Sequence, residues 1–199
     1  MFVWLASYPK SGNTLLRSML AAYFFSKDGI YNFSLIRNIK QFPHGGLFIK
    51  MGIDIKNHNE TVKNYIKAQE SFNKKDAVQF IKTHSYLFNF NKENAFTDVN
   101  NTLGVIYIVR DPRNVVTSFS KYRGLTNEEM ADFMITGSGD GLTWTNNWAS
   151  NFHSWKLFKE HERYLLIKYE DLINKRELTF LNILNFIHKI TKSKLVLDK

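Results

Sequence analysis

The stretch MFVWLASYPKSGNTLLRSML, residues 1–20, contains an apolar run, a short polar loop and the start of an amphipathic run. The apolar residues 2–6 predict a buried strand, and Pro9 and Gly12 predict a tight turn after it. Residues 13–25 carry apolar side chains at helical spacing, which predicts a helix. A buried strand that leads through a tight turn into a helix is the first unit of a parallel α/β sheet.

The rest of the chain repeats this alternation of strand and helix. Apolar runs predict further strands at residues 78–82, 104–109 and 164–168. Helical patterns predict helices at residues 60–70, 112–121, 143–161 and 176–190. This order predicts an α/β fold of three layers, with a central, mainly parallel sheet flanked by helices. The sequence has neither a repeat nor a linker, so residues 1–199 are expected to form a single domain.

The composition is that of a globular protein, and it limits the possible chemistry. Hydrophobic residues make up 44% and charged residues 23% of the 199 residues, as in an ordinary soluble domain. The absence of cysteine excludes disulfides, cysteine nucleophiles and thiolate metal sites. No segment of the sequence is long and apolar enough to span a bilayer, and the apolar start is too short for a signal peptide. We therefore expect a cytoplasmic location.

The net charge of +9 suits an anionic ligand, a nucleic acid or an acidic membrane surface. A solvated, lysine-rich face explains the same excess without any function. The sequence lacks the interleaving of aromatic and basic residues that is typical of nucleic-acid-binding domains. No specific nucleic-acid partner is therefore expected.

The loop after the first strand, Ser7–Thr14 (SYPKSGNT), has the properties of a phosphate site. A strand end followed by a helix start gathers unpaired backbone N–H groups at the positive end of the helix, where phosphate binds well. Lys10 adds a point charge, and Ser11 and Thr14 add hydroxyl donors. The alternative is a plain turn in which Asn13 caps the helix and no ligand binds.

A second candidate phosphate site follows the strand at residues 104–109. Arg110 stands at the carboxyl end of this strand, where open parallel sheets bind ligands. Ser118 lies about two turns along the helix that Pro112 opens. A guanidinium group and a hydroxyl can grip one phosphate together. The alternative is that Arg110 forms a local ion pair with Asp111 at the cap of the helix.

Two more strand ends carry side chains of interest. The strand at residues 78–82 ends in Lys82, and His84 follows it. A lone histidine is usually structural or exposed, but His84 shares its position after a strand with both phosphate candidates. Tyr169 follows the strand at residues 164–168 and can stack on a base or, alternatively, belong to the core.

Three of these segments resemble, in order, the motifs of the PAPS-dependent sulfotransferases, and the resemblance covers residues 2 to about 190. Pro-Lys-Ser-Gly-x-Thr, from Pro9 to Thr14, is similar to the 5′-phosphosulfate loop of that family. Arg-x-Pro-x-x-x-x-x-Ser, from Arg110 to Ser118, is similar to its 3′-phosphate motif. Lys-Thr-His, residues 82–84, resembles the segment that carries its general base.

The resemblance implies a P-loop-like fold and the in-line transfer of a sulfuryl group from PAPS to a hydroxyl or amine, with PAP as the product. The acceptor is expected to be a small molecule or a carbohydrate. By the same resemblance His84 is the general base, and Lys10 and Lys82 stabilise the reacting groups. The implied donor site consists of Lys10, Ser11, Gly12, Asn13, Thr14, Arg110, Ser118 and Tyr169. No cluster of metal ligands is apparent in the sequence, so no metal is expected.

Two features differ from the family pattern. Many members carry a tryptophan after the threonine of the phosphate loop, where this chain has Leu15. Many members also have a basic segment, Arg-Lys-Gly followed by Gly-x-Trp, for which this sequence, ending at Lys199, has no counterpart. We therefore expect the donor site to be less completely closed than in those members.

Two other functions stay open at this point. A phosphotransferase similar to the P-loop nucleotide kinases needs a lysine after the last glycine of the loop, where this chain has Asn13. A protein that binds PAP or PAPS without catalysis needs no general base. The identity of the acceptor is not readable, but residues 26–76 and 123–143 are expected to build its pocket.

Overall fold

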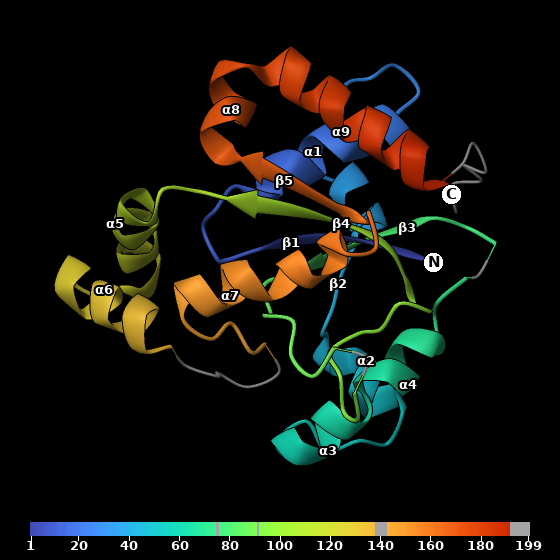
Figure 1. Cartoon of the computed structure of the whole chain (residues 1–199), viewed down its shortest axis with the longest axis vertical. Helices are drawn as coiled ribbons and strands as arrows, with labels where there is room; N and C mark the ends of the chain where they lie inside the picture. The colour runs from blue at the N-terminus through green and yellow to red at the C-terminus, as the bar shows by residue number, and fades with distance from the viewer. Residues whose placement is uncertain (75, 91, 138–142, 192–199) are drawn as a thin grey trace.

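The computed structural model describes residues 1–74, 76–90, 92–137 and 143–191. Within these residues a five-stranded sheet has the order β2-β3-β1-β4-β5, and each neighbouring pair is parallel (Figure 1). The strands are β1 (Phe2–Ser7), β2 (Lys40–Gln41), β3 (Gln79–Thr83), β4 (Thr102–Val109) and β5 (Tyr164–Lys168). The predicted α/β class and the parallel sheet are confirmed.

Helices cover both faces of the sheet. They are α1 (Asn13–Phe25), α2 (Gly45–Lys50), α3 (His58–Lys63), α4 (Tyr65–Glu70), α5 (Pro112–Arg123), α6 (Asn127–Thr136), α7 (Trp148–Ser154), α8 (Tyr169–Asn174) and α9 (Arg176–Thr191), with 3-10 turns η1 (Leu35–Asn38) and η2 (Trp155–Lys159). In Figure 1, α1, α8 and α9 lie on one face, and α7 and the α2–α4 group lie on the other. Helices α5 and α6 lie beyond the carboxyl end of β4.

The two faces of β1 are buried in different ways. Val3 and Leu5 pack under α1 and α9 in a cluster whose buried residues are mainly aliphatic, whereas Trp4 belongs to an aromatic-rich cluster on the other face. The Trp4 ring lies 6.1 Å from the Trp155 ring, and its Nε1 donates to Thr102 Oγ1 over 2.9 Å. Because β1 is central and fully buried, the loop that follows it starts from a fixed point.

The prediction of one long helix over residues 143–161 is wrong. The structure has α7 and then η2, because Asn146 adopts a left-handed backbone (φ 57°) and the side chain of Asn147 caps α7 by accepting from Ser150 N. Trp148 and Trp155, which lie on either side of this break, therefore pack in different places. Trp155 is buried in the aromatic cluster, whereas Trp148 stacks on Phe152.

The segment before β3 is built from short pieces. The single helix predicted at residues 60–70 is two helices, α3 and α4, which meet at Asn64. The Nδ2 atom of Asn64 donates to the carbonyl oxygen of Glu60, and the backbone of Asn64 (φ −105°, ψ 7°) is not helical. Residues 26–60, for which the sequence predicts no element, contain η1, β2 and α2.

No helix in the described part of the chain is long and apolar enough to cross a membrane. The cytoplasmic location stays a prediction.

Candidate functional site

The four sequence segments singled out above meet at one edge of the sheet. Each follows the carboxyl end of a strand, and β3, β1, β4 and β5 are neighbours in that order. Parallel strands bring their carboxyl ends to a common edge, which is where open α/β sheets bind ligands. A cavity of about 700 Å³ lies there. Its lining includes nine of the predicted site residues: Lys10, Gly12, Asn13, Thr14, Lys82, His84, Arg110, Ser118 and Tyr169.

Ser11, the tenth predicted residue, lies behind the cavity wall. Its side chain is fully buried, and its Oγ has no hydrogen-bond partner in the structure. A buried hydroxyl without a partner costs free energy, so such groups are usually satisfied when a ligand or water is present. Ser11 therefore leaves an unsatisfied hydroxyl in the loop that the sequence predicts to bind phosphate.

The loop between β1 and α1 takes a shape that exposes backbone N–H groups. Lys10 (φ 63°) and Gly12 (φ 98°) both have left-handed backbones, and Gly12 is the N-cap of α1 without any side-chain cap. The first amides of α1 thus have no intrahelical or side-chain acceptor. Together with the positive end of a 13-residue helix they form an anion-binding position.

Asn13 does not cap α1, in contrast to the alternative considered from the sequence. Its side chain turns back toward the strand, where Nδ2 donates to the carbonyl oxygen of Leu5 at 2.8 Å and to Ser7 Oγ at 3.1 Å. Asn13 is buried, so these two bonds fix the loop to the end of β1. Thr14 is exposed and leaves its hydroxyl at the cavity.

Arg110 connects the second phosphate motif to the first. Its Nη1 donates to the carbonyl oxygen of Lys10 at 3.1 Å, and its guanidinium carbon lies 4.4 Å from the centre of the Tyr169 ring. The Nε atom of Arg110 is buried without a partner. Ser118, on α5, lines the same cavity. Arg110 and Ser118 therefore line one cavity, as the predicted 3′-phosphate motif requires.

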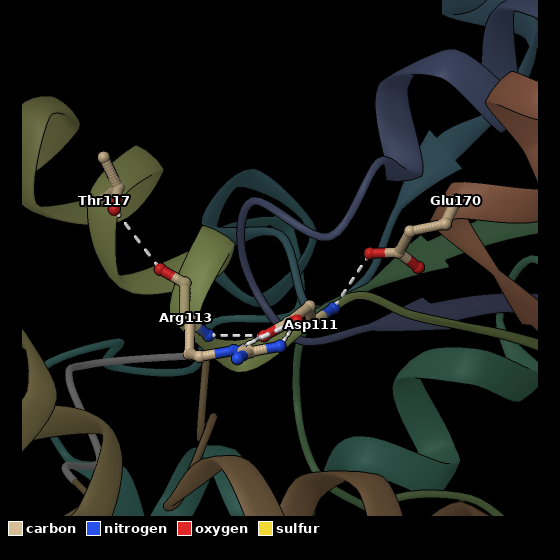
Figure 2. A network of polar contacts seen from close by, with 4 residues as sticks. All are labelled: Asp111, Arg113, Thr117 and Glu170. Atoms are coloured by element: carbon tan, nitrogen blue, oxygen red, sulfur yellow. Dashed lines mark hydrogen bonds and ion pairs between the residues drawn. The ribbon is translucent and has the colours of Figure 1, made fainter.

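The cap of α5 leaves Arg110 free of the local ion pair considered from the sequence. Asp111 instead accepts from the backbone N–H of Arg113 at 2.9 Å and pairs with the exposed guanidinium of Arg113 (Figure 2). The backbone N–H of Asp111 donates to Glu170 Oε1 at 3.1 Å, as Figure 2 shows. Glu170 thus ties the Arg110 turn to the start of α8, directly beside Tyr169.

His84 is held in one tautomer by the end of β1. Its Nδ1 lies 2.8 Å from the carbonyl oxygen of Ser7 and 3.2 Å from Ser7 Oγ. A carbonyl oxygen can only accept, so Nδ1 carries the proton and Nε2 keeps a lone pair. Burial, and then the charge of Lys82, lower the pKa of His84 to about 3. The imidazole is therefore neutral at pH 7 and can accept a proton at Nε2.

Lys82 and Lys10 bring positive charge near His84. Burial and the nearby Arg17 guanidinium lower the pKa of Lys82 to about 8, and its Nζ donates to Gln41 Oε1 at 2.9 Å. The Nζ atom of Lys10 lies 4.7 Å from the centre of the Tyr122 ring, a cation–π contact across the cavity. Each charge is thus positioned by a specific neighbour.

Several cavity residues were not named individually from the sequence, although Arg123, Phe133 and Thr143 fall within residues 123–143, where part of the acceptor pocket is expected. Phe119, Tyr122 and Arg123 come from α5, and Phe133 comes from α6. Tyr122 lies one helical turn beyond Ser118, a spacing that could have indicated it. Thr145, just beyond that segment, has no pattern in the sequence that indicates it.

The two segments that the sequence predicts to build the acceptor pocket differ in whether they line the cavity. Residues 123–143 do contribute to the cavity, although residues 138–142 lie outside the described part of the chain. The described residues of 26–76 do not line it, and eight of them, between Arg37 and Phe72, border a second cavity instead. Among the described residues no group of three or more histidine, aspartate or glutamate side chains could hold a metal ion.

Solved structures with the same fold include two enzymes bound to PAP. The chain is similar to mouse sulfotransferase SULT7A1 complexed with PAP, at 18% identity and a TM-score of 0.54, over 97% of this chain and 63% of that one. It is also similar to retinol dehydratase in complex with androsterone and the inactive cofactor PAP, at 16% identity and a TM-score of 0.57, over 94% and 59%. The chain thus spans about three fifths of the length of these relatives. At this identity the likeness shows the fold.

The sequence itself carries the assignment to a family. No curated protein sequence matches the chain. A family model described as the sulfotransferase domain matches residues 2–198, which is nearly the whole chain. The matched range includes the phosphate loop, His84 and the Arg110 motif. The chain therefore belongs to the sulfotransferase domain family.

Proposed function

We propose that this protein transfers a sulfuryl group from PAPS to a hydroxyl or amine of an acceptor, with His84 as the general base. One observation carries the proposal: the neutral His84, the loop after β1 and the Arg110–Ser118 motif all line the wall of a single cavity. Family membership supplies the class of reaction.

The donor site is supported by polar groups that lack partners. Ser11 Oγ and Arg110 Nε are buried and unpaired, and the first amides of α1 have no cap. A nucleotide with one phosphate group at each end of its ribose can satisfy both ends at once. In this proposal the loop from Lys10 to Thr14 binds the 5′-phosphosulfate, and Arg110 with Ser118 binds the 3′-phosphate. In the same proposal Tyr169, whose ring contacts Gly12 and Arg110, stacks on or bonds to the base.

The chain's own groups then perform three tasks in an in-line displacement. His84 Nε2 takes the proton of the acceptor hydroxyl or amine as that atom forms its bond to sulfur. Lys10 stabilises the negative charge that grows on the bridging oxygen as the bond between sulfur and that oxygen breaks. Lys82 stabilises the charge on the transferring group. The proton thus goes to His84, and the electron pair of the broken bond stays on the bridging oxygen of the leaving nucleotide, beside Lys10.

The acceptor in this proposal is a small molecule or a carbohydrate. Phe119, Tyr122 and Phe133 line the cavity and offer apolar surface to a ring. The relative retinol dehydratase was crystallised with androsterone and with retinol, both small molecules. A protein that binds PAP or PAPS without catalysis is the alternative that the experiment below distinguishes from this proposal.

Two measurements on one preparation test the proposal. PAP binding is measured by calorimetry, and sulfuryl transfer from radiolabelled PAPS is screened over phenols, sugars and amines. The proposal predicts saturable PAP binding and label in at least one acceptor. PAP binding with no transfer to any acceptor would favour the non-catalytic alternative, and no PAP binding would reject the donor site itself.

A further inference from the structure

A second cavity, of about 510 Å³, lies beside the edge strand β2. Four basic side chains line it, from η1, β2, the turn after β2 and α2: Arg37, Lys40, His44 and Lys50. No carboxylate is among its described lining residues. Arg37, Lys40 and Lys50 form no ion pair with any residue that the structure describes. The cavity is therefore a concave surface with uncompensated positive charge.

One hydrogen bond connects this basic cavity to the site of the proposed chemistry. Gln41 lines the basic cavity, and its Oε1 accepts from Lys82 Nζ at 2.9 Å. Lys82 in turn lines the donor cavity together with His84. Gln41 and Lys82 are also paired in the sheet register of β2 and β3. Only the hydrogen-bonded side chains of Gln41 and Lys82 thus lie between a ligand in the basic cavity and the cavity that His84 lines.

The segment that carries two of the basic residues is fixed to the donor site. The Nη2 atom of Arg17, on α1, donates to the carbonyl oxygens of Ile36 at 3.3 Å and Ile39 at 2.8 Å. In the chain, Ile36 directly precedes Arg37, and Ile39 directly precedes Lys40. Because α1 begins at the phosphate loop, the basic wall and the donor site share one rigid support. Preorganisation of this kind favours a binding site over a freely moving lysine-rich surface.

The rest of the lining indicates what sort of molecule fits. Leu47 and Phe72 supply an apolar wall, and both pack against the aromatic cluster under the sheet. A ligand that suits this cavity combines a ring or short apolar body with a negative group that reaches the basic side chains. The volume is that of a small-molecule site.

We propose that the cavity beside β2 is an acceptor subsite, and that the acceptor is a hydroxylated compound carrying a carboxylate or sulfate group of its own. This inference rests on the proposed function, because it places the acceptor hydroxyl at His84 and the acceptor's anion beyond Lys82 and Gln41. The anion is held by Lys40, Lys50 and Arg37. Small hydroxy acids and acidic sugars share this chemistry.

The test compares matched acceptors that differ only in charge. One arm uses 4-hydroxyphenylalkanoates of increasing chain length and their methyl esters. The other uses a uronic-acid disaccharide and its methyl ester. For each pair we measure kcat/KM for transfer from PAPS and, independently of turnover, calorimetric binding to the PAP-loaded protein. The inference predicts that the acid is preferred over its ester by tenfold or more in at least one arm, which also identifies the source of the anion.

The variants use a control with the same loss of charge. Lys40→Gln combined with Lys50→Gln should bring the ratio of acid to ester close to one. Lys63→Gln combined with Lys67→Gln removes two exposed lysines of α3 and α4 and should leave the ratio at its wild-type value. Equal transfer to acid and ester in the wild-type protein would overturn the subsite and leave the proposed function intact. If neither compound is sulfated, the binding preference decides, and equal binding of acid and ester overturns the subsite.

Discussion

The ring of Tyr169 lies directly over the backbone of Gly12, so that a Cβ atom placed on Gly12 would be 2.3 Å from Cδ2 of the ring. The same ring lies under the guanidinium group of Arg110. One aromatic side chain therefore fixes the distance between the loop after β1 and the turn after β4. The two anion positions of the proposed donor site are set by this contact.

Gly12→Ala should disrupt the donor site more than the backbone strain alone explains. Gly52 also has a positive φ (76°) but nothing within 4 Å of a Cβ, so Gly52→Ala is a matched control for the strain, which costs about 1–3 kcal/mol. Thermal unfolding and PAP calorimetry should show a loss of stability in both variants, larger in Gly12→Ala, but a clear loss of PAP binding in Gly12→Ala only. Equal PAP affinity in both variants would show that the contact with Tyr169 does not matter.

Asn13 and Thr14 are adjacent in the loop, but substitution of Asn13 should affect stability, whereas substitution of Thr14 should affect PAP binding. Asn13→Ala removes two buried hydrogen bonds to the end of β1 and should lower the free energy of unfolding by about 1–3 kcal/mol. Thr14 is exposed, so Thr14→Ala should keep the stability and weaken PAP binding. Denaturant unfolding and calorimetry of both variants check this. A stable Asn13→Ala protein would contradict the role assigned to its side chain.

Arg110→Ala should weaken PAP binding by roughly 10- to 100-fold, because it removes a charged donor from one phosphate. Arg113→Ala is the control, since Arg113 is an exposed arginine three residues away whose guanidinium pairs with Asp111 rather than with the cavity. Calorimetric titration with PAP separates the two. A comparable loss of affinity in both variants would mean that general charge, not the position of Arg110, binds the nucleotide.

The rate should fall at alkaline pH because of Lys82. Its pKa is lowered to about 8, so it is cationic below pH 8 and loses its charge as the pH rises through that value. The kcat/KM for the donor, which reports groups of the free enzyme, should decline above about pH 8. Lys82→Arg keeps the charge and should remove this decline, whatever its effect on the maximum rate. An unchanged alkaline limb in that variant would assign the decline to another group.

The sequence predicted best where local rules decide the structure. The strand, loop and helix of residues 2–25 follow from an apolar run, a turn and helical periodicity, and the convergence of Lys10, His84 and Arg110 follows from the geometry of parallel strands. The order of the strands is set by long-range pairing, which local sequence patterns do not show. The contacts within the site could therefore not be predicted, because neither the Gln41–Lys82 hydrogen bond nor the contact of Tyr169 with Gly12 follows from a local pattern.

The region before β3 could not be predicted for a related reason. Helices α2, α3 and α4 are six residues each, too short to be stable alone, and they are held by aromatic packing. Phe42, Phe48, Tyr65 and Phe96 contact one another in this cluster although they are spread over 55 positions of the chain. Such non-local contacts leave no periodic pattern.

The central claim is that His84 takes the acceptor's proton, and one variant tests it most directly. In His84→Asn the new amide can still donate to the carbonyl oxygen of Ser7, so the fold of the loop is preserved while the base is removed. Single-turnover transfer from PAPS and PAP affinity are measured on the same protein, with His58→Asn, a change to an exposed histidine of α3, as the control. The account predicts a loss of transfer of about 100-fold or more with little change in PAP affinity. Transfer at the wild-type rate in His84→Asn would contradict it.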